Sequence, residues 1–136
     1  MSWDIFVQNL PADARTVAEI PDDFRPAPLM ARSALLEQIK EAVPEVDFTD
    51  TSRGRIEGPG YSIEVQVGDA DPVTSFVFHV RGGDLAAGVV ADVLDRLGLR
   101  AIDPGSDSGF FSRDTATASL AAWRGYRDRT FGQVRP

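Results

Sequence analysis

The strongest hydrophobic pattern in the chain spans residues 72–99 and predicts a strand, a glycine turn and a helix. Phe76, Phe78 and Val80 alternate with the two-residue period of a strand, and Val77 partly fills its other face. We therefore expect this strand to lie inside a sheet. After the turn, apolar residues recur at helical spacing and predict a stripe about 100° wide that must be buried. The residues of this stripe are Leu85, Val89, Val90, Val93, Leu94 and Leu97.

Both ends of this helix carry sequence signals. Asp84 is a typical N-cap residue, and Gly98 fits the left-handed position that follows many helices. Leu99 would then fold back on Leu94, in the hydrophobic contact that accompanies a Schellman ending. Because the apolar pattern, the N-cap residue and the glycine after the helix all agree, we predict that this segment forms part of the core.

Before this segment, the pattern predicts a strand at residues 3–8, a long irregular segment at 11–32 and a helix at 33–43. Four prolines exclude regular structure from the irregular segment, apart from a short helical turn at 16–20. Pro44 ends the helix. We expect the irregular segment to be anchored on the core by spaced apolar residues, which are Val17, Ile20, Phe24 and Leu29.

The other strands are shorter or lie at the edges. Residues 61–67 alternate cleanly, which predicts an antiparallel strand that forms a hairpin with residues 76–80. Residues 46–48, 55–57 and 100–103 are each expected to form a short extended segment.

A last helix is predicted at about 114–129, after a turn-rich loop that positions Phe110 and Phe111. We expect residues 132–136 to be frayed and Trp3 to be in the core. The buried stripe of the last helix would consist of Ala116, Leu120, Trp123 and Tyr126.

Together these elements predict a single α+β domain over residues 1–136. Its sheet would be mainly antiparallel, with four or five strands and two or three helices packed on one face. Two helical crossovers that flank a hairpin lead us to hypothesise a ferredoxin-like topology.

Charge and composition narrow the classes of function. The chain has no cysteine, no run of about 18 apolar residues and no basic leader, so we expect a cytoplasmic protein that does not enter a membrane. Its net charge is −7, and the five arginines and two aspartates from Arg113 onward leave −10 on residues 1–112. An acidic domain repels phosphate backbones, so we expect no nucleic-acid partner. The same charge attracts a basic protein, although it also serves solubility alone.

Four residues near the end of the predicted sheet are candidates for ligand binding: His79, Arg81, Asp103 and Ser106. The single histidine could act as a general base, and Arg81 would share its face of the strand and could hold an anion. The same pair could equally form the solvated face of a strand. The chain contains no phosphate-binding glycine motif, nucleophile elbow or calcium loop, so we predict no catalytic residue, metal or cofactor.

A second candidate surface lies in the irregular segment. Its acidic side chains surround an aromatic residue, which is how a protein-recognition patch can look, and the candidate partner-binding residues are Glu19, Asp22, Asp23 and Phe24. The alternative is a solvated acidic loop held by its own apolar side chains. A homo-oligomer that uses this segment or the last helix is a third hypothesis.

Four stretches of the chain resemble a family of small bacterial proteins of about this length: residues 1–8 (MSWDIFVQ), 20–26 (IPDDFRP), 79–84 (HVRGGD) and 103–106. No activity is assigned to that family, so the resemblance implies no catalytic residues. Small acidic α+β bacterial proteins include immunity proteins that neutralise a toxin, which is an analogy of fold and charge. We therefore expect a non-enzymatic protein-binding module, with a small enzyme or ligand-binding domain as the alternative.

Overall fold

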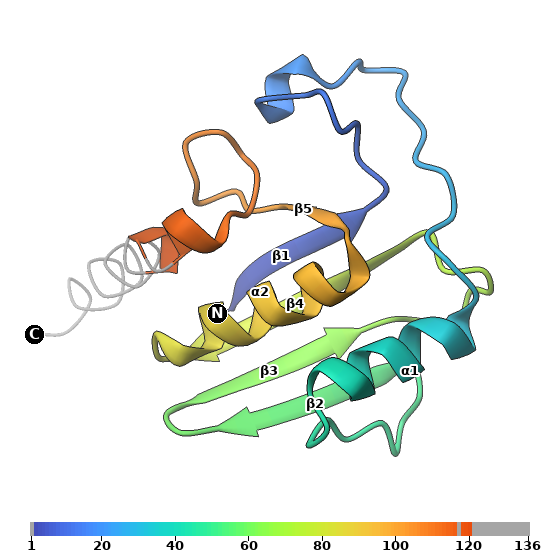
Figure 1. The fold of residues 1–136 in the computed structure, drawn as a ribbon, viewed down its shortest axis with the longest axis vertical. Coiled ribbons are helices and arrows are strands. Elements are labelled where there is room, and N and C mark those ends of the chain that lie inside the picture. The colour runs from blue at the N-terminus through green and yellow to red at the C-terminus, as the bar shows by residue number, and fades with distance from the viewer. Residues whose placement is uncertain (1, 117, 121–136) are drawn as a thin grey trace, which may run out of the picture.

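The chain folds into a five-stranded antiparallel sheet with helices packed against one face, so the predicted α+β class is confirmed (Figure 1). This computed structural model describes residues 2–116 and 118–120. The elements in chain order are β1 (Trp3–Gln8), η1 (Val17–Glu19), α1 (Arg32–Ala42), β2 (Arg53–Gly58), β3 (Tyr61–Gln66), β4 (Ser75–Gly82), α2 (Leu85–Leu97) and β5 (Arg100–Ile102).

The strand order is β2-β3-β4-β1-β5, and each neighbouring pair is antiparallel. Strands β4 and β5 consequently run in the same direction, with β1 between them, and α2 makes the crossover that joins them. The connection through α1 joins β1 to β2, which run in opposite directions. Only one of the two crossovers that a ferredoxin-like fold requires is therefore present, and that hypothesis is not confirmed.

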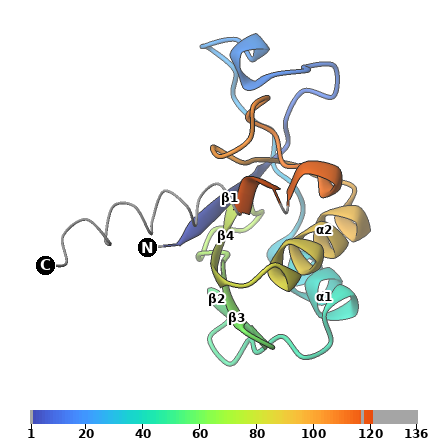
Figure 2. The same cartoon turned by 90° about the vertical axis from the view of Figure 1, so that its left-hand side faces the viewer.

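The centre of the core is the pairing of β1 with β4. Trp3 lies opposite Val80 and Ile5 lies opposite Phe78, and these four side chains are each at most 2% exposed. The predicted alternation of the central strand and the predicted burial of Trp3 are thus confirmed. Helices α1 and α2 cover this side of the sheet together, as Figure 2 shows. We call the opposite side, which carries the alternate residues of each strand, the open face.

Helix α2 is rotated relative to the predicted stripe. Leu85 is 62% exposed, whereas Val90, Val93 and Leu94 are buried as expected. The first turn instead buries two small residues, Ala86 and Ala87, and leaves Leu85 on the exposed side of the helix. Apolar spacing predicted burial of Leu85, but the buried side of the helix lies toward Ala86 and Ala87 instead.

The two ends of α2 agree with the sequence to different degrees. Gly98 has φ +65°, its N–H donates to the carbonyl of Asp95 at 3.3 Å, and the N–H of Leu99 donates to the carbonyl of Leu94 at 3.2 Å. This is the predicted Schellman ending. Asp84 occupies the N-cap position, but its side chain makes no capping hydrogen bond.

The edges of the sheet are covered by short pieces of chain. Asp47 exchanges both backbone hydrogen bonds with Arg55 of β2, so the strand expected at 46–48 is reduced to a single bridge. Strand β2 itself begins at Arg53, two residues earlier than predicted. At the other edge, Phe110 forms a bridge with Ile102 of β5. At each edge, one isolated bridge therefore occupies part of the outer strand.

The last predicted helix is described only in its first part. Residues 113–116 and 118–120 are helical, and the expected burial of Ala116 and Leu120 is confirmed. The predicted contacts of Trp123 and Tyr126 and the expected frayed end at 132–136 lie outside the described residues. No helix in the described ranges is long and apolar enough to cross a bilayer.

Candidate functional site

The segment between β1 and α1, residues 9–31, projects from the body formed by the sheet and its two helices, and we call it the acidic loop (Figures 1 and 2). Within it only η1 is regular, which matches the short turn predicted at 16–20. Its apolar residues do not all cover the main core as expected. Leu29 packs on that core, whereas the others build a separate loop cluster, which comprises Leu10, Ala14, Val17, Ile20 and Phe24 with Ile102 and Phe110.

The acidic loop is fastened to the loop that follows β5. The N–H of Val17 donates to the carbonyl of Ser108 at 2.9 Å. Gly109 has φ +83°, and a Cβ atom added there would lie 2.4 Å from Cγ2 of Val17, so the two backbones meet where only glycine fits. The Arg100 guanidinium stacks 3.8 Å from the centre of the Phe110 ring and donates to the carbonyl of Pro11. The acidic loop is therefore held in place by packing and hydrogen bonds.

Two of the four predicted partner-binding residues line a hollow in the acidic loop. Glu19 and Phe24 border a cavity of about 300 Å³, whose walls also include Pro11, Asp13, Ala14 and Pro21. Asp22 and Asp23 are exposed beside it and make no ion pair with any described residue. The fold of the acidic loop is what brings Asp13 and the two prolines together with Glu19 and Phe24.

The open face carries the other predicted residues, His79 and Arg81. Four side chains form one row across β2, β3, β4 and β1, namely Arg55, Glu64, His79 and Asp4. His79 Nδ1 lies 2.8 Å from Asp4 Oδ1, and its Nε2 lies 2.7 Å from Gln66 Oε1. Both ring nitrogens are thus engaged by polar side chains within the sheet.

Arg81 lies in a polar hollow of about 250 Å³ on the open face, and it makes no ion pair with a described residue. Two arginines and two glutamates line this hollow, so their formal charges balance. The lining residues are Arg55, Glu57, Ser62, Ile63, Glu64, His79 and Arg81. This balance gives the hollow no net preference for the anion predicted at Arg81.

Asp103 is separated from His79 by the sheet itself. Its carboxylate is 1% exposed on the helix-covered side, where it accepts hydrogen bonds from Trp3 Nε1 at 2.9 Å, from the N–H of Gly105 at 2.9 Å and from Ser119 Oγ at 2.6 Å. Ser106 Oγ lies 2.8 Å from the carbonyl of Phe110 and 3.2 Å from that of Asp103. The structure thus pairs His79 with Arg81 and Asp103 with Ser106, but it does not bring the four together.

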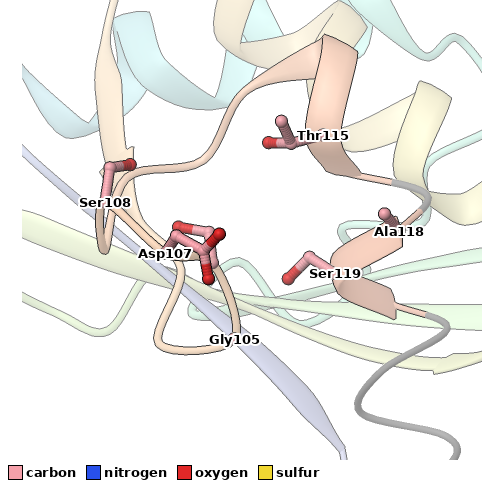
Figure 3. A pocket seen from close by; sticks show the side chains of 7 residues that line it. Gly105, Asp107, Ser108, Thr115, Ala118 and Ser119 are labelled. Atoms are coloured by element: carbon pink, nitrogen blue, oxygen red, sulfur yellow. The ribbon is translucent and has the colours of Figure 1, made fainter.

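A third hollow, of about 390 Å³, lies between the loop after β5 and the helical residues that follow it (Figure 3). The hydroxyl of Ser119 points from the helix toward the loop and is bonded to Asp103, and that of Ser106 is bonded to backbone carbonyls. Ser108 Oγ accepts a hydrogen bond from the backbone N–H of Phe110 at 3.1 Å, so three of the four hydroxyls in the wall serve the fold. No group of three or more His, Asp or Glu side chains within the described ranges is placed to hold a metal ion.

Three surfaces thus compete for a function, and the acidic loop is the one that combines a hollow, an uncompensated charge and a fixed backbone. Comparisons with protein-family models, with curated proteins and with solved structures give no match for the chain.

Proposed function

We propose that the chain is a protein-binding module that presents its acidic loop to a basic protein partner. One observation carries this proposal: the acidic loop packs in a hydrophobic cluster, shared with Ile102 and Phe110, that is separate from the core that the sheet and helices close. Ordering a residue costs about 1–2 kcal/mol of backbone entropy. A long loop that is ordered on a separate cluster therefore needs a reason other than covering the core, and such loops are commonly functional.

Charge defines the partner. Residues 1–120 carry 20 acidic and 10 basic side chains, and the acidic loop carries four acidic and two basic ones. Such a surface speeds the approach of a positively charged protein and repels nucleic acid. A fixed loop also loses little conformational freedom when it binds, which favours affinity.

An enzymatic alternative receives less support from the geometry. Asp103 and His79 lie on opposite faces of the sheet, and the bonds of the Asp103 carboxylate join β1 to the last helix. An enzyme that used His79 and Arg81 on the open face would therefore lack the carboxylate of Asp103.

The specific form of binding that we favour is an immunity-type inhibitor, which works in the cytoplasm by covering a basic toxin domain. This rests on acidic charge and small α+β architecture, and so on analogy. If a captured partner is a toxin, one equivalent of the chain should abolish its activity.

The test is capture of partners from the native host by the immobilised chain. The decisive variant is Asp22→Lys with Asp23→Lys, because both side chains are exposed and unpaired within the described part of the chain. The matched control is Glu37→Lys with Glu45→Lys, which adds the same charge at exposed positions in and just after α1. A partner kept by the unmodified chain and the control but lost by the decisive variant supports the proposal. Equal capture by all three, or capture of no protein, overturns it.

A further inference from the structure

We infer that the hollow in the acidic loop is a pocket for one arginine side chain of the basic partner. This inference rests on the proposed function and names the chemical group of the partner that the acidic loop binds. The pocket walls combine two carboxylates, Asp13 and Glu19, with one aromatic ring, Phe24, and two proline rings. No lysine or arginine is among the lining residues.

The size of the pocket selects a side chain over a larger ligand. Its volume of about 300 Å³ lies at the lower end of the range for small-molecule sites, about 300–1,000 Å³. A cofactor or nucleotide would need more room, whereas a guanidinium on its three-carbon stem would fill it. The apolar stem would lie against Pro11, Pro21 and Phe24, and the charged head would meet the carboxylates at the rim.

The chemistry of the walls favours a planar cation. Phe24 is half-buried, so one part of its ring is fixed by the loop cluster while another faces the pocket. A guanidinium can stack on such a ring and at the same time donate two hydrogen bonds to a carboxylate. Glu19 Oε2 accepts a hydrogen bond of 2.6 Å from the backbone N–H of Arg15, which orients the carboxylate and leaves its other oxygen for a ligand.

The two arginines of the acidic loop do not occupy this pocket. Arg25 donates to the carbonyl of Phe24 at 3.1 Å, and Arg15 has no side-chain partner among the described residues. Neither lines the pocket. The cation must therefore come from outside the acidic loop, as the proposed function requires.

The experiment uses the full chain and a set of capped amino acids as probes. N-acetyl-arginine amide, with one positive charge, is titrated while backbone amide shifts are followed by NMR, and the N-acetyl amides of lysine, glutamine and glutamate serve as comparisons. We expect the arginine probe to shift the amides of Asp13, Glu19 and Phe24 with a Kd of about 1–10 mM, the range of a single side-chain contact. Lysine should bind more weakly, and glutamine and glutamate should not bind there.

Variants decide whether the pocket is responsible. Glu19→Gln and Asp13→Asn should each weaken arginine binding by about threefold to tenfold, and Phe24→Leu should do the same while it keeps the loop cluster filled. Glu37→Gln, which removes an exposed carboxylate from α1, should leave binding unchanged. Equal binding of all four probes, shifts centred elsewhere, no binding, or insensitivity to Glu19→Gln would each overturn the inference.

The outcome is separable from that of the proposed function. If the arginine probe fails but Asp22→Lys with Asp23→Lys still abolishes partner capture, the pocket is wrong and the acidic loop remains the binding surface. If the probe binds as expected but Asp22→Lys with Asp23→Lys leaves partner capture unchanged, the pocket does bind arginine and the protein-binding proposal fails.

Discussion

Trp3 and Asp103 are a hundred residues apart in sequence and are joined by a buried hydrogen bond of 2.9 Å between the indole N–H and the carboxylate. The same carboxylate accepts from Ser119 Oγ at 2.6 Å, so one side chain ties β1 to the start of the last helix. Burial of a carboxylate is tolerated when its oxygens accept hydrogen bonds, and all three donors to Asp103 are neutral groups.

Removing this carboxylate should destabilise the fold. Asp103→Ala leaves three donors, from Trp3, Gly105 and Ser119, without an acceptor, and we expect a loss of at least about 3 kcal/mol in the free energy of unfolding, from about 1–3 kcal/mol per orphaned group. Urea denaturation monitored by tryptophan fluorescence and by circular dichroism would measure it. Asp107→Asn, at an exposed position in the same loop, is the control and should change stability by less than about 0.5 kcal/mol. A small loss for Asp103→Ala would contradict the structure.

The rotation of α2 makes a prediction opposite to that of the sequence pattern. Because Leu85 is 62% exposed, Leu85→Gln should change the free energy of unfolding by no more than about 0.5 kcal/mol. Leu94 is 5% exposed, and Leu94→Ala should cost about 2–5 kcal/mol. The predicted stripe would make both positions costly. Thermal and urea unfolding of the two variants decide between them.

These residues show where sequence reasoning succeeds and where it stops. The alternation of Phe76, Phe78 and Val80 identified the central strand, because a strand buried on one side must repeat every two residues. The left-handed Gly98 followed from local chemistry in the same way. The exposure of Leu85 did not, because it depends on which side of α2 packs against the sheet, and that side carries Ala86 and Ala87.

The candidate site shows the same division. Glu19 and Phe24 could be selected from composition, and the fold places both at one pocket. The separation of Asp103 from His79 could not be foreseen, because it depends on how β5 pairs with β1 and on an indole a hundred residues away. Sequence pattern assigns a residue to a face of its own strand but does not say which residues of distant strands share that face.

Acid should weaken the fold through the turn before β2. Hydrogen bonds from the hydroxyl and the backbone N–H of Thr49 lower the pKa of Asp47, and those of Ser52 lower the pKa of Asp50 in the same way. A carboxyl whose pKa is lower in the folded state stabilises the fold above its unfolded value, near 3.8, and this contribution is lost as pH falls through the folded value.

The expected result is a difference in the slope of stability against pH. Asp47→Asn with Asp50→Asn should lower stability at pH 7 and reduce the loss of stability between pH 4 and more acidic conditions, since the variant has fewer protons to take up. Glu37→Gln with Glu45→Gln is a matched control for charge alone. Melting temperatures across the pH series measure both, and parallel curves for the two double variants would refute the role of the turn.

Gly109 tests whether the acidic loop is held by its contact with the neighbouring loop. Gly109→Ala must force a left-handed backbone on alanine and push its Cβ into Val17, at a cost of at least about 1–2 kcal/mol. The strain falls on the contact between the two loops, so the acidic loop should loosen while the β1–β4 core stays closed. Amide hydrogen exchange should therefore speed up at Val17, whose N–H is bonded to Ser108, and stay unchanged at Phe78.

A matched glycine substitution separates strain from a general effect of added methyl groups. Gly88 lies exposed within α2 with no atom within 4 Å of an added Cβ, so Gly88→Ala should stabilise the fold by about 0.5–1 kcal/mol through helix propensity. If Gly109→Ala left exchange at Val17 unchanged, the acidic loop would be held by its apolar cluster alone. If it speeded exchange at Phe78 as well, the loop contact and the sheet would unfold as one unit, and the acidic loop would not be an independent platform.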